Sequence, residues 1–444
     1  MKILILDPYK KADYRICKDT NGGYGTANNF GNKLIPKILK YLLKKKSDYP
    51  SLHVAYTYAV LKELRHQVDY EKNLPKDFNT YDLFIVVSSI VCCETELENI
   101  KFLKSKNKKI FVIGPFSTNN PKIYSDAGAT VILGESEFYF LSNKDFKKDF
   151  DKDIIRFDHF LQLDDLPFPK WDLMIKDFKG VDKLYGNLKS VTILATRGCP
   201  YSCFHYCVYP LSQGRKVRQR SPENIIKEMK YWKENHNVKM FIFRDPVFSI
   251  NRKHTIELCN LLIKEKLDIK FAIETHLRIL DSELLDLLIK SGLKATIVGV
   301  ESANQDVLKN SNRFTVKKDE QLIKIRELEK KNIQVSSMFI LGFPHDNFVT
   351  MNETINYAKQ LNTTYSLFNI WTPYPGTPVF NSYKDKIIKN KYESFDMNTL
   401  VFKHQNLTEK NISDYLSKAY TKYYFRLNWL IKYLKSFYHP NKII

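Results

Sequence analysis

Three cysteines lie within nine residues of this chain, in the run TRGCPYSCFHYCVYP. They are Cys199, Cys203 and Cys207, and three residues separate each from the next. Structural zinc sites are normally closed by four ligands, and most 4Fe-4S clusters are held by four cysteines. Three thiolates without an obvious fourth therefore indicate a metal centre with one open position, and we expect the chemistry to start there.

Two other interpretations of the cysteine run stay open. His205 stands between the second and third cysteines and could serve as the fourth ligand of a closed zinc site. Such a run can also be what is left of a cluster site that has been lost. The zinc interpretation would make the chain a basic, zinc-containing binding protein without catalysis.

The composition and the cysteine count bound the class of protein. The 444 residues, 43% of them hydrophobic, suffice for two or three domains with large cores. An odd total of seven cysteines, three of them clustered, favours a reducing compartment over a disulfide framework. The longest nearly uncharged apolar run, residues 83–93, is too short to span a bilayer, and residues 1–7 are typical of a strand rather than a signal peptide. We therefore expect a globular, cytoplasmic protein.

The formal net charge of +21 raises the question of a polyanionic partner. Lysines are spread over nearly every predicted helix and loop, as in residues 44–50 and 104–109. This distribution is typical of solvated faces, so we expect no specific nucleic-acid partner.

The first 140 residues alternate apolar strands with helical stretches. The predicted strands cover 3–7, 67–70, 82–90, 109–116 and 130–135, with helices near 52–65, 94–106 and 121–127. This alternation predicts a doubly wound parallel sheet with helices on both faces and a ligand site beyond the carboxyl ends of the strands. The glycine-rich run NGGYGTANNFG fails the dinucleotide fingerprint, and we interpret it as a flexible loop over a ligand or an ordinary surface loop.

A second alternation surrounds the cysteines. Its predicted strands cover 191–196, 239–243, 269–274, 295–300, 334–341 and 365–371. Six strand–helix units in series predict a partial (β/α)6 barrel of the TIM type, with active residues on the loops after the strands. The cysteine run follows the first of these strands, and Asp245, Glu274, Glu301 and Pro344 follow or close the next four.

The chain thus divides into four predicted segments. A doubly wound domain covers 1–145, a linker covers 146–188, the partial barrel covers 189–390 and a helical extension covers 391–444. The extension is aromatic and basic at helical spacing. It either packs an apolar stripe on the barrel or makes amphipathic contact with a membrane surface.

In this setting the cysteine run resembles that of the radical S-adenosylmethionine (radical SAM) enzymes. The chain is most similar to those members that carry an N-terminal cobalamin (B12)-binding domain, and the likeness covers nearly all of it. The other motifs that carry the likeness are RQRSPENIIKEM, FRDPVFSINRKH, ETHLRILDSELLDLLIKSG, GVES, FILGFPHD, TPYPGTPVF, and VIGPF followed by GATVILGESE.

The resemblance implies a set of ligand contacts. Cys199, Cys203 and Cys207 would bind a 4Fe-4S cluster whose fourth iron holds S-adenosylmethionine, and a 5'-deoxyadenosyl radical would take hydrogen from an unactivated carbon. The implied contacts are Tyr206 beside the adenine, Asp245 at the methionine amino group, Glu301 and Ser302 near the ribose, and Glu274, His276 and Arg278 at the methionyl carboxylate or substrate. For the carboxylates the alternative is a strand-end residue that caps a helix or pairs with a lysine.

The chain departs from the family in two ways. The family has three and then two residues between its cysteines, whereas Phe204, His205 and Tyr206 separate the last pair here. An extra residue can bulge without moving the flanking sulfurs, so we still expect a cluster. The motif that supplies a cobalt ligand in many cobalamin proteins, Asp-x-His-x-x-Gly, is also absent, and His53 and His66 fall in a predicted helix and at its end. Cobalamin is therefore expected to bind without a histidine on cobalt.

The function implied is cobalamin-dependent methylation of an unactivated carbon in a small-molecule or lipid-like substrate. An external one-electron reductant such as flavodoxin or ferredoxin would supply the electrons. Ring formation or rearrangement without methyl transfer stays open. A tRNA methylthiotransferase would need a second cysteine triad, but Cys17, Cys92 and Cys93 look more like buried hydrophobic residues.

Overall fold

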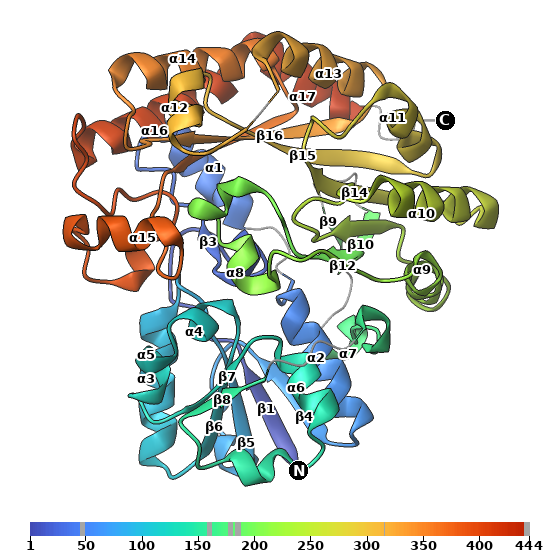
Figure 1. Cartoon of the computed structure of the whole chain (residues 1–444), viewed down its shortest axis with the longest axis vertical. Coiled ribbons are helices and arrows are strands. Elements are labelled where there is room, and N and C mark those ends of the chain that lie inside the picture. Colours follow the sequence, from blue (N-terminus) through green and yellow to red (C-terminus); the bar gives the residue numbers. More distant parts are fainter. Residues whose placement is uncertain (45–48, 158–161, 176–180, 183–187, 315, 439–444) are drawn as a thin grey trace.

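The computed structural model describes residues 1–44, 49–157, 162–175, 181–182, 188–314 and 316–438. Two sheets of parallel strands dominate it, one in the N-terminal part and one in the remainder of the chain (Figure 1). The predicted α/β fold class is confirmed.

The first sheet is the predicted doubly wound sheet. Its six parallel strands lie in the order β4-β1-β5-β6-β7-β8. Their bounds are β1 (Lys2–Leu6), β4 (Gln67–Glu71), β5 (Leu83–Val87), β6 (Lys109–Ile113), β7 (Thr130–Leu133) and β8 (Ile154–Arg156). Because β1 lies between β4 and β5, the strand order reverses beside it, and ligands of such sheets bind at this switch point.

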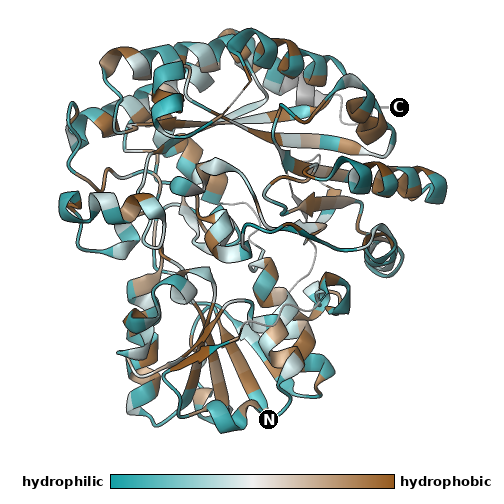
Figure 2. Ribbon diagram, viewed as in Figure 1, coloured by the Kyte–Doolittle hydropathy of each residue, from teal (hydrophilic) through white to brown (hydrophobic). Residues whose placement is uncertain are grey.

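Helices cover both faces of this sheet, which is why its strands are continuously apolar (Figure 2). One face carries α2 (Leu52–Glu63) and α6 (Ser136–Ser142), and the other carries α3 (Cys93–Ser105), α4 (Pro115–Asn119) and α5 (Pro121–Ser125). Alternate side chains of β1 belong to these two cores, with Ile3 and Ile5 in one and Leu4 and Leu6 in the other.

The second sheet is the predicted partial barrel. Six parallel strands lie in chain order, and the short strand β9 (Val181–Asp182) pairs antiparallel with the first of them. The parallel strands are β10 (Leu188–Ile193), β13 (Met240–Phe243), β14 (Lys270–Thr275), β15 (Leu293–Glu301), β16 (Gln334–Leu341) and β17 (Tyr365–Ile370). Burial alternates along β16 and β17, so one face is packed and the other is only partly covered. An open barrel of this kind leaves its inner face accessible to a ligand.

Five of the six barrel helices described here, all but α13, begin where the sequence supplies a capping side chain. The six helices are α9 (Pro222–His236), α10 (Arg252–Glu265), α11 (Ser282–Lys290), α12 (Gln305–Asn310), α13 (Lys318–Lys330) and α14 (Phe348–Leu361). Ser221, Asn251, Asp281, Asn304 and Asn347 each accept a hydrogen bond from a backbone N–H in the first turn of the helix that follows.

The C-terminal extension packs on the barrel. Helix α16 (Glu409–Tyr424) lies against β17, where the hydroxyl of Tyr420 donates to the carbonyl of Phe368 at 3.0 Å. Helix α17 (Leu427–Tyr438) follows, and its Trp429 Nε1 donates to the carbonyl of Thr364 at 3.0 Å. The predicted packing of the apolar stripe is confirmed for α16.

Strand β8 belongs to the first sheet although it falls in the segment predicted as a linker. Residues 158–161, 176–180 and 183–187 of that segment lie outside the described residues. The remaining elements are β2 (Ile16–Cys17), β3 (Thr26–Ala27), α1 (Leu34–Lys44), α7 (Trp171–Met174), β11 (Thr196–Arg197), α8 (Tyr209–Gln213), β12 (Arg218–Gln219) and α15 (Pro378–Tyr383). Over the described ranges, no helix has the length and apolar character needed to cross a bilayer.

Candidate active site

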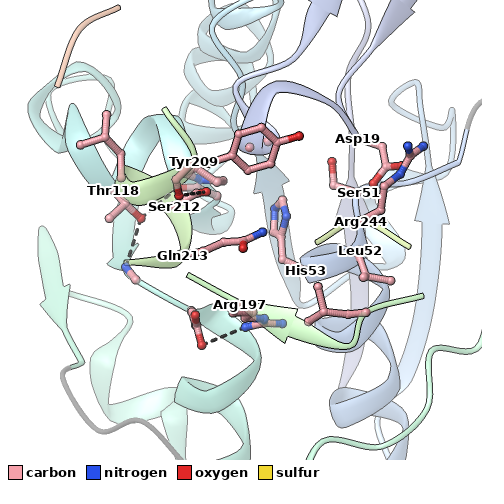
Figure 3. A pocket seen from close by; sticks show the side chains of 18 of the residues that line it. Asp19, Ser51, Leu52, His53, Thr118, Arg197, Tyr209, Ser212, Gln213 and Arg244 are labelled. Carbon is pink, nitrogen blue, oxygen red and sulfur yellow. Dashed lines mark hydrogen bonds and ion pairs between the residues drawn. The ribbon is translucent and has the colours of Figure 1, made fainter. Parts of the chain in front are cut away.

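Loops that follow strands of both sheets line one cavity (Figure 3). Its volume, including the part open to solvent, is about 740 Å³. The residues that line it include Asp19, Gly22, Gly23, His53, Gly114, Pro115, Glu135, Arg197, Tyr209, Gln213 and Arg244. The cavity therefore lies at the expected edge of the first sheet, and the glycine-rich run predicted to cover a ligand contributes two of its residues.

Charged groups from both halves of the chain meet at this cavity. Arg244 Nε, just after β13, lies 2.7 Å from Asp19 Oδ2 in the N-terminal half. Burial raises the pKa of Asp19 to about 6, and the Arg244 charge opposes that rise. Burial also lowers the pKa of His53 to about 4, so its imidazole is neutral at pH 7. Sequence reasoning assigned no role to any of these three residues.

The segment before the cysteines is anchored to the N-terminal domain. Arg197, on β11, lies 2.8 Å from Glu135 Oε2 and 2.6 Å from Glu137 Oε1, and all three side chains are nearly fully buried. Arg218, on β12, donates to the same Glu135 at 2.9 Å. These ion pairs join the barrel to the loop after β7 and to the first turn of α6, so they fix the start of the cysteine loop against the first sheet.

The three cysteines occupy one short loop after β11. The thiols of Cys203 and Cys207 are hydrogen-bonded to each other, and the backbone N–H of Cys207 donates to the carbonyl of Cys203 at 3.0 Å. This thiol contact and nearby Arg313 lower the pKa of Cys203 to about 7. Burial raises the pKa of Cys199. Among the described residues, no three His, Cys, Asp or Glu side chains lie in an arrangement that could hold a metal ion.

The donor chemistry of this loop nevertheless fits a three-thiolate cluster. All seven cysteines have free thiols. Cys203 and Cys207 are the two that are partly exposed, and their thiols are hydrogen-bonded to each other. Cys17, Cys92 and Cys93 are buried, as predicted, and Cys92 and Cys93 lie among the hydrophobic residues of a core.

Arg313 is the most informative residue that sequence reasoning missed. Its Nη1 donates to Cys203 Sγ at 3.8 Å, and its Nη2 lies 3.0 Å from Glu301 Oε1 and donates to the carbonyl of Gly299 at 3.3 Å. The pair places a positive charge beside the cysteine sulfurs. No motif reveals it, because Arg313 comes from the segment after α12.

Glu301 closes β15 in a strained conformation. Its φ is 66°, which is uncommon for a residue other than glycine, and the register with β16 shifts between Gly299 and Glu301. Irregularities of this kind change the direction of side chains near functional sites. The carboxylate of Glu301 lies against Arg313, and burial raises the pKa of Glu301.

Asp245 has a positioning task in this structure. Its carboxylate accepts hydrogen bonds from the N–H of Ala195 at 3.1 Å, from the N–H of Thr196, and from the Thr196 hydroxyl at 2.7 Å. It is fully buried, and that burial raises its pKa to about 6. Asp245 thus ties the end of β13 to the segment that leads into the cysteine loop.

Glu274 and Tyr206 lie inside the barrel. The hydroxyl of Tyr209 donates to Glu274 Oε2 at 3.4 Å, and burial raises the pKa of Glu274 to about 7. The Tyr206 ring meets Phe343 edge-on with ring centroids 6.2 Å apart, and burial raises its pKa well above the ordinary value.

The other predicted residues make hydrogen bonds of their own or are exposed. The Ser302 hydroxyl accepts from the N–H of Asn304 at 3.1 Å and lies in the core, while Arg278 is exposed. Both ring nitrogens of His276 are hydrogen-bonded, one 3.0 Å from the carbonyl of Phe314 and the other accepting from the N–H of Arg278 at 3.1 Å. His276 therefore has no free nitrogen with which to act as a general base.

Known proteins resemble the chain most clearly in the barrel. A model of the radical SAM superfamily matches residues 193–358, the stretch that contains the cysteines and most of the barrel. Residues 193–358 are therefore similar to the radical SAM superfamily. A solved structure of similar fold is the radical SAM methyltransferase TsrM of Kitasatospora setae with cobalamin and a [4Fe-4S] cluster bound, with a TM-score of 0.61 and 14% identity over 86% of this chain and 78% of that one. This likeness covers both sheets, so it bears out the predicted fold class of a doubly wound sheet followed by a partial barrel.

Curated relatives of the chain carry methyltransferase and cyclase names. An uncharacterized methyltransferase of Pyrococcus horikoshii is 28% identical over 61% of this chain, which spans 58% of that relative. The bacteriochlorophyllide d C-12(1)-methyltransferase of Chlorobaculum tepidum is 24% identical over 79% of this chain and 76% of its own length. The anaerobic magnesium-protoporphyrin IX monomethyl ester cyclase of Rubrivivax gelatinosus is 28% identical over 54% of this chain and 46% of its own.

Proposed function

We propose that this radical SAM protein is a cobalamin-dependent methyltransferase that acts on an unactivated carbon of a small-molecule or lipid-like substrate. One observation carries the proposal: the cavity at the switch point of the first sheet is bounded on its other side by the segments that flank the cysteine loop. A methyl carrier in this cavity would thus lie next to the loop that holds the radical source, and the methyltransferase names of relatives support the assignment.

In this proposal Cys199, Cys203 and Cys207 hold the 4Fe-4S cluster. The cluster and S-adenosylmethionine, when bound, supply the one-electron chemistry that yields a 5'-deoxyadenosyl radical. Cys203 and Cys207 are already in contact, and the Arg313 guanidinium beside Cys203 offsets the negative charge of thiolates. Contact between these two thiols supports a loop that accommodates the extra residue between them.

The remaining site residues take binding and positioning roles. Glu301, aimed inward by its strained backbone, and Tyr206 would contact the ribose and adenine, with Ser302 supporting the loop after β15. Glu274, buried and hydrogen-bonded to Tyr209, would meet the polar end of methionine or the substrate, with Arg278 at the exposed rim. Asp245 would act by holding the residues before the cysteine loop rather than by touching the methionine amino group.

Partners and location follow from the same proposal. Each radical cycle needs an external one-electron donor such as flavodoxin or ferredoxin. The free cysteines among the described residues suit a reducing cytoplasm.

We also infer a peripheral contact with an anionic membrane. Helix α1 exposes an apolar row at helical spacing, flanked by lysines, which suits anionic lipid. Its exposed apolar side chains are Leu34 (71%), Ile38 (46%), Tyr41 (59%) and Leu42 (53%). Co-sedimentation with phosphatidylglycerol vesicles tests it, and an equal recovery with neutral vesicles or none would contradict it.

Ring formation is the second candidate, favoured by the cyclase name of one relative. S-adenosylmethionine with a deuterated methyl group separates the two reactions, because methylation moves the label into the product and cyclisation does not.

The proposal is tested by replacing one cysteine of the loop. Cys203→Ala is expected to abolish the formation of 5'-deoxyadenosine from S-adenosylmethionine under reducing, anaerobic conditions. Cys259→Ala is the matched control, since Cys259 is buried on α10 away from the loop and its loss should leave that activity intact. Production by Cys203→Ala at the wild-type level would overturn the assignment.

A further inference from the structure

The cysteine loop has an outer surface that does not line the cavity. Pro200 and Ser202, which stand between the first two cysteines, are exposed to solvent. The cavity is lined by residues that precede or follow the cysteines, such as Arg197 and Tyr209, and neither Pro200 nor Ser202 is among them. The stretch between the first two cysteines therefore belongs to the molecular surface rather than to the cavity wall.

Two other segments extend this outer surface. Arg215, just before β12, is exposed, and its Nη2 donates to the carbonyl of Pro200 at 2.9 Å. On the other side, Ser202 Oγ donates to the carbonyl of Asn312 at 3.1 Å. Phe314 follows two residues later and is 71% exposed. The surface around the loop is thus built from three segments that are distant in sequence and hydrogen-bonded to one another.

The charged side chains of these segments are all positive. Lys216 is exposed in the segment that flanks the loop on one side. Lys309 is exposed near the end of α12 on the other side, and its carbonyl accepts from the N–H of Asn312 at 3.1 Å. Residues 198–216 and 309–314 contain no aspartate and no glutamate, in a chain with 49 acidic residues. These segments therefore present cations and an aromatic ring without carboxylates of their own.

The same surface is connected to the cysteines by short contacts. Arg313, the chain neighbour of Phe314, donates to Cys203 Sγ at 3.8 Å. The carbonyl of Phe314 lies 3.0 Å from His276 Nε2, and the His276 ring meets the Tyr201 ring of the loop with centroids 5.6 Å apart. Electron transfer slows steeply with distance, so a donor must rest on a surface that adjoins the cysteines. This surface meets that condition.

We propose that the outer face defined by Pro200, Ser202, Lys216, Lys309 and Phe314 is the docking surface for an acidic one-electron donor protein. The inference rests on the proposed function, which requires such a donor in each radical cycle. A positive face attracts an acidic partner and makes the rate of association depend on ionic strength. Electron-transfer complexes are weak and small, so one exposed ring flanked by cations suffices. Docking here leaves the cavity free for its own ligands.

The test measures how fast the oxidised cluster of the full-length protein is reduced by flavodoxin hydroquinone, an acidic donor, in stopped-flow absorbance experiments. Photoreduced 5-deazaflavin is the reference, because a small uncharged reductant needs no docking surface. Lys216→Glu/Lys309→Glu is expected to slow reduction by flavodoxin by about tenfold and to leave reduction by 5-deazaflavin unchanged. Raising the ionic strength should slow the wild-type protein towards the rate of the variant.

Matched controls separate this face from the overall charge and from exposure alone. Lys403→Glu/Lys410→Glu reverses two exposed lysines in and just before α16. Phe425→Ser removes a ring that is also 71% exposed, at the end of that helix. Neither control should change reduction by flavodoxin, whereas Phe314→Ser should slow it severalfold.

Cross-linking supplies a second readout that does not depend on catalysis. A carbodiimide joins a lysine directly to a carboxylate of a docked partner. Flavodoxin should become linked through Lys216 or Lys309, as identified by mass spectrometry of the joined peptides. Cross-links confined to other lysines would overturn the inference.

The remaining outcomes separate the docking face from the proposed function. With the cluster in place, equal rates of Lys216→Glu/Lys309→Glu and the wild type with flavodoxin would overturn the docking face alone. Equal slowing by the control pair would also overturn it, since the attraction would then be to the overall charge. Slowing with both reductants would assign the face to support of the cluster, and wild-type dimers that the variant abolishes would assign it to a second copy; either overturns it. A wild-type protein that acquires no iron would overturn both.

Discussion

At the scale of single residues, the surroundings of Cys203 depend on a buried ion pair. Arg313 and Glu301 are both nearly buried, with 10% and 13% of their side chains exposed, and Arg313 also reaches the cysteine sulfur. Removing one partner of such a pair leaves an uncompensated charge, whereas removing both leaves none.

Arg313→Met is therefore expected to lower the free energy of unfolding by about 3–5 kcal/mol. The double variant Arg313→Met/Glu301→Gln should recover most of that loss, because no buried charge is then left unpaired. Urea titration of the apoprotein measures both. Equal stabilities of the single and double variants would show that the pair is not energetically coupled.

At the scale of elements, strand ends position the cysteine loop. Asp245, after β13, holds the residues that follow β10, and the bulge in β15 aims Glu301. Both residues were predicted as rim residues because polar side chains follow the strands of a barrel. Their actual partners depend on tertiary contacts, so the sequence could not distinguish a ligand contact from a positioning role.

Asp245 makes stability depend on pH. Burial raises its pKa from 3.8 to about 6, so between these values the folded chain binds the proton more tightly than the unfolded chain does. Its contribution to stability therefore falls as the pH rises from 4 to 6, by up to about 3 kcal/mol. Unfolding of the wild-type protein and of Asp245→Asn at pH 4 and pH 7 measures this, and the stability of the variant relative to wild type should increase with pH. A pH-independent difference would contradict it.

Sequence reasoning succeeded where chemistry is local and failed where it is not. The strands, the two sheets and the cysteine loop follow from periodicity and spacing, and they were predicted within a few residues. Arg313, Arg197 and His53 reach the site only because distant segments meet there. His53 in particular looked like an ordinary helical residue, because no motif in its sequence neighbourhood links it to the cavity.

At the scale of the whole molecule, the two domains are joined by buried charges. Arg197 on the barrel side pairs with Glu135 and Glu137 on the other side, and these contacts close the wall of the shared cavity. The relative position of the domains is thus linked to the segment that carries the cysteines.

Arg197→Met should lower the thermal stability strongly, with a loss of about 3–5 kcal/mol, because Glu137 is then buried without its partner. Arg252→Met is a matched control, since Arg252 also pairs with two carboxylates, Asp281 and Glu283, but at an exposed site. Its loss should be below about 1 kcal/mol. Calorimetry measures both variants, and similar losses would contradict the coupling of the domains through Arg197.

The central claim is that the cysteine loop holds a 4Fe-4S cluster in an enzyme rather than a zinc ion in a binding protein. The most direct test is metal and sulfide analysis of the full chain after anaerobic purification and reconstitution. The expected result is about four irons and four sulfides per chain in the wild-type protein, with both lost in Cys203→Ala. One zinc per chain and no iron would contradict the account.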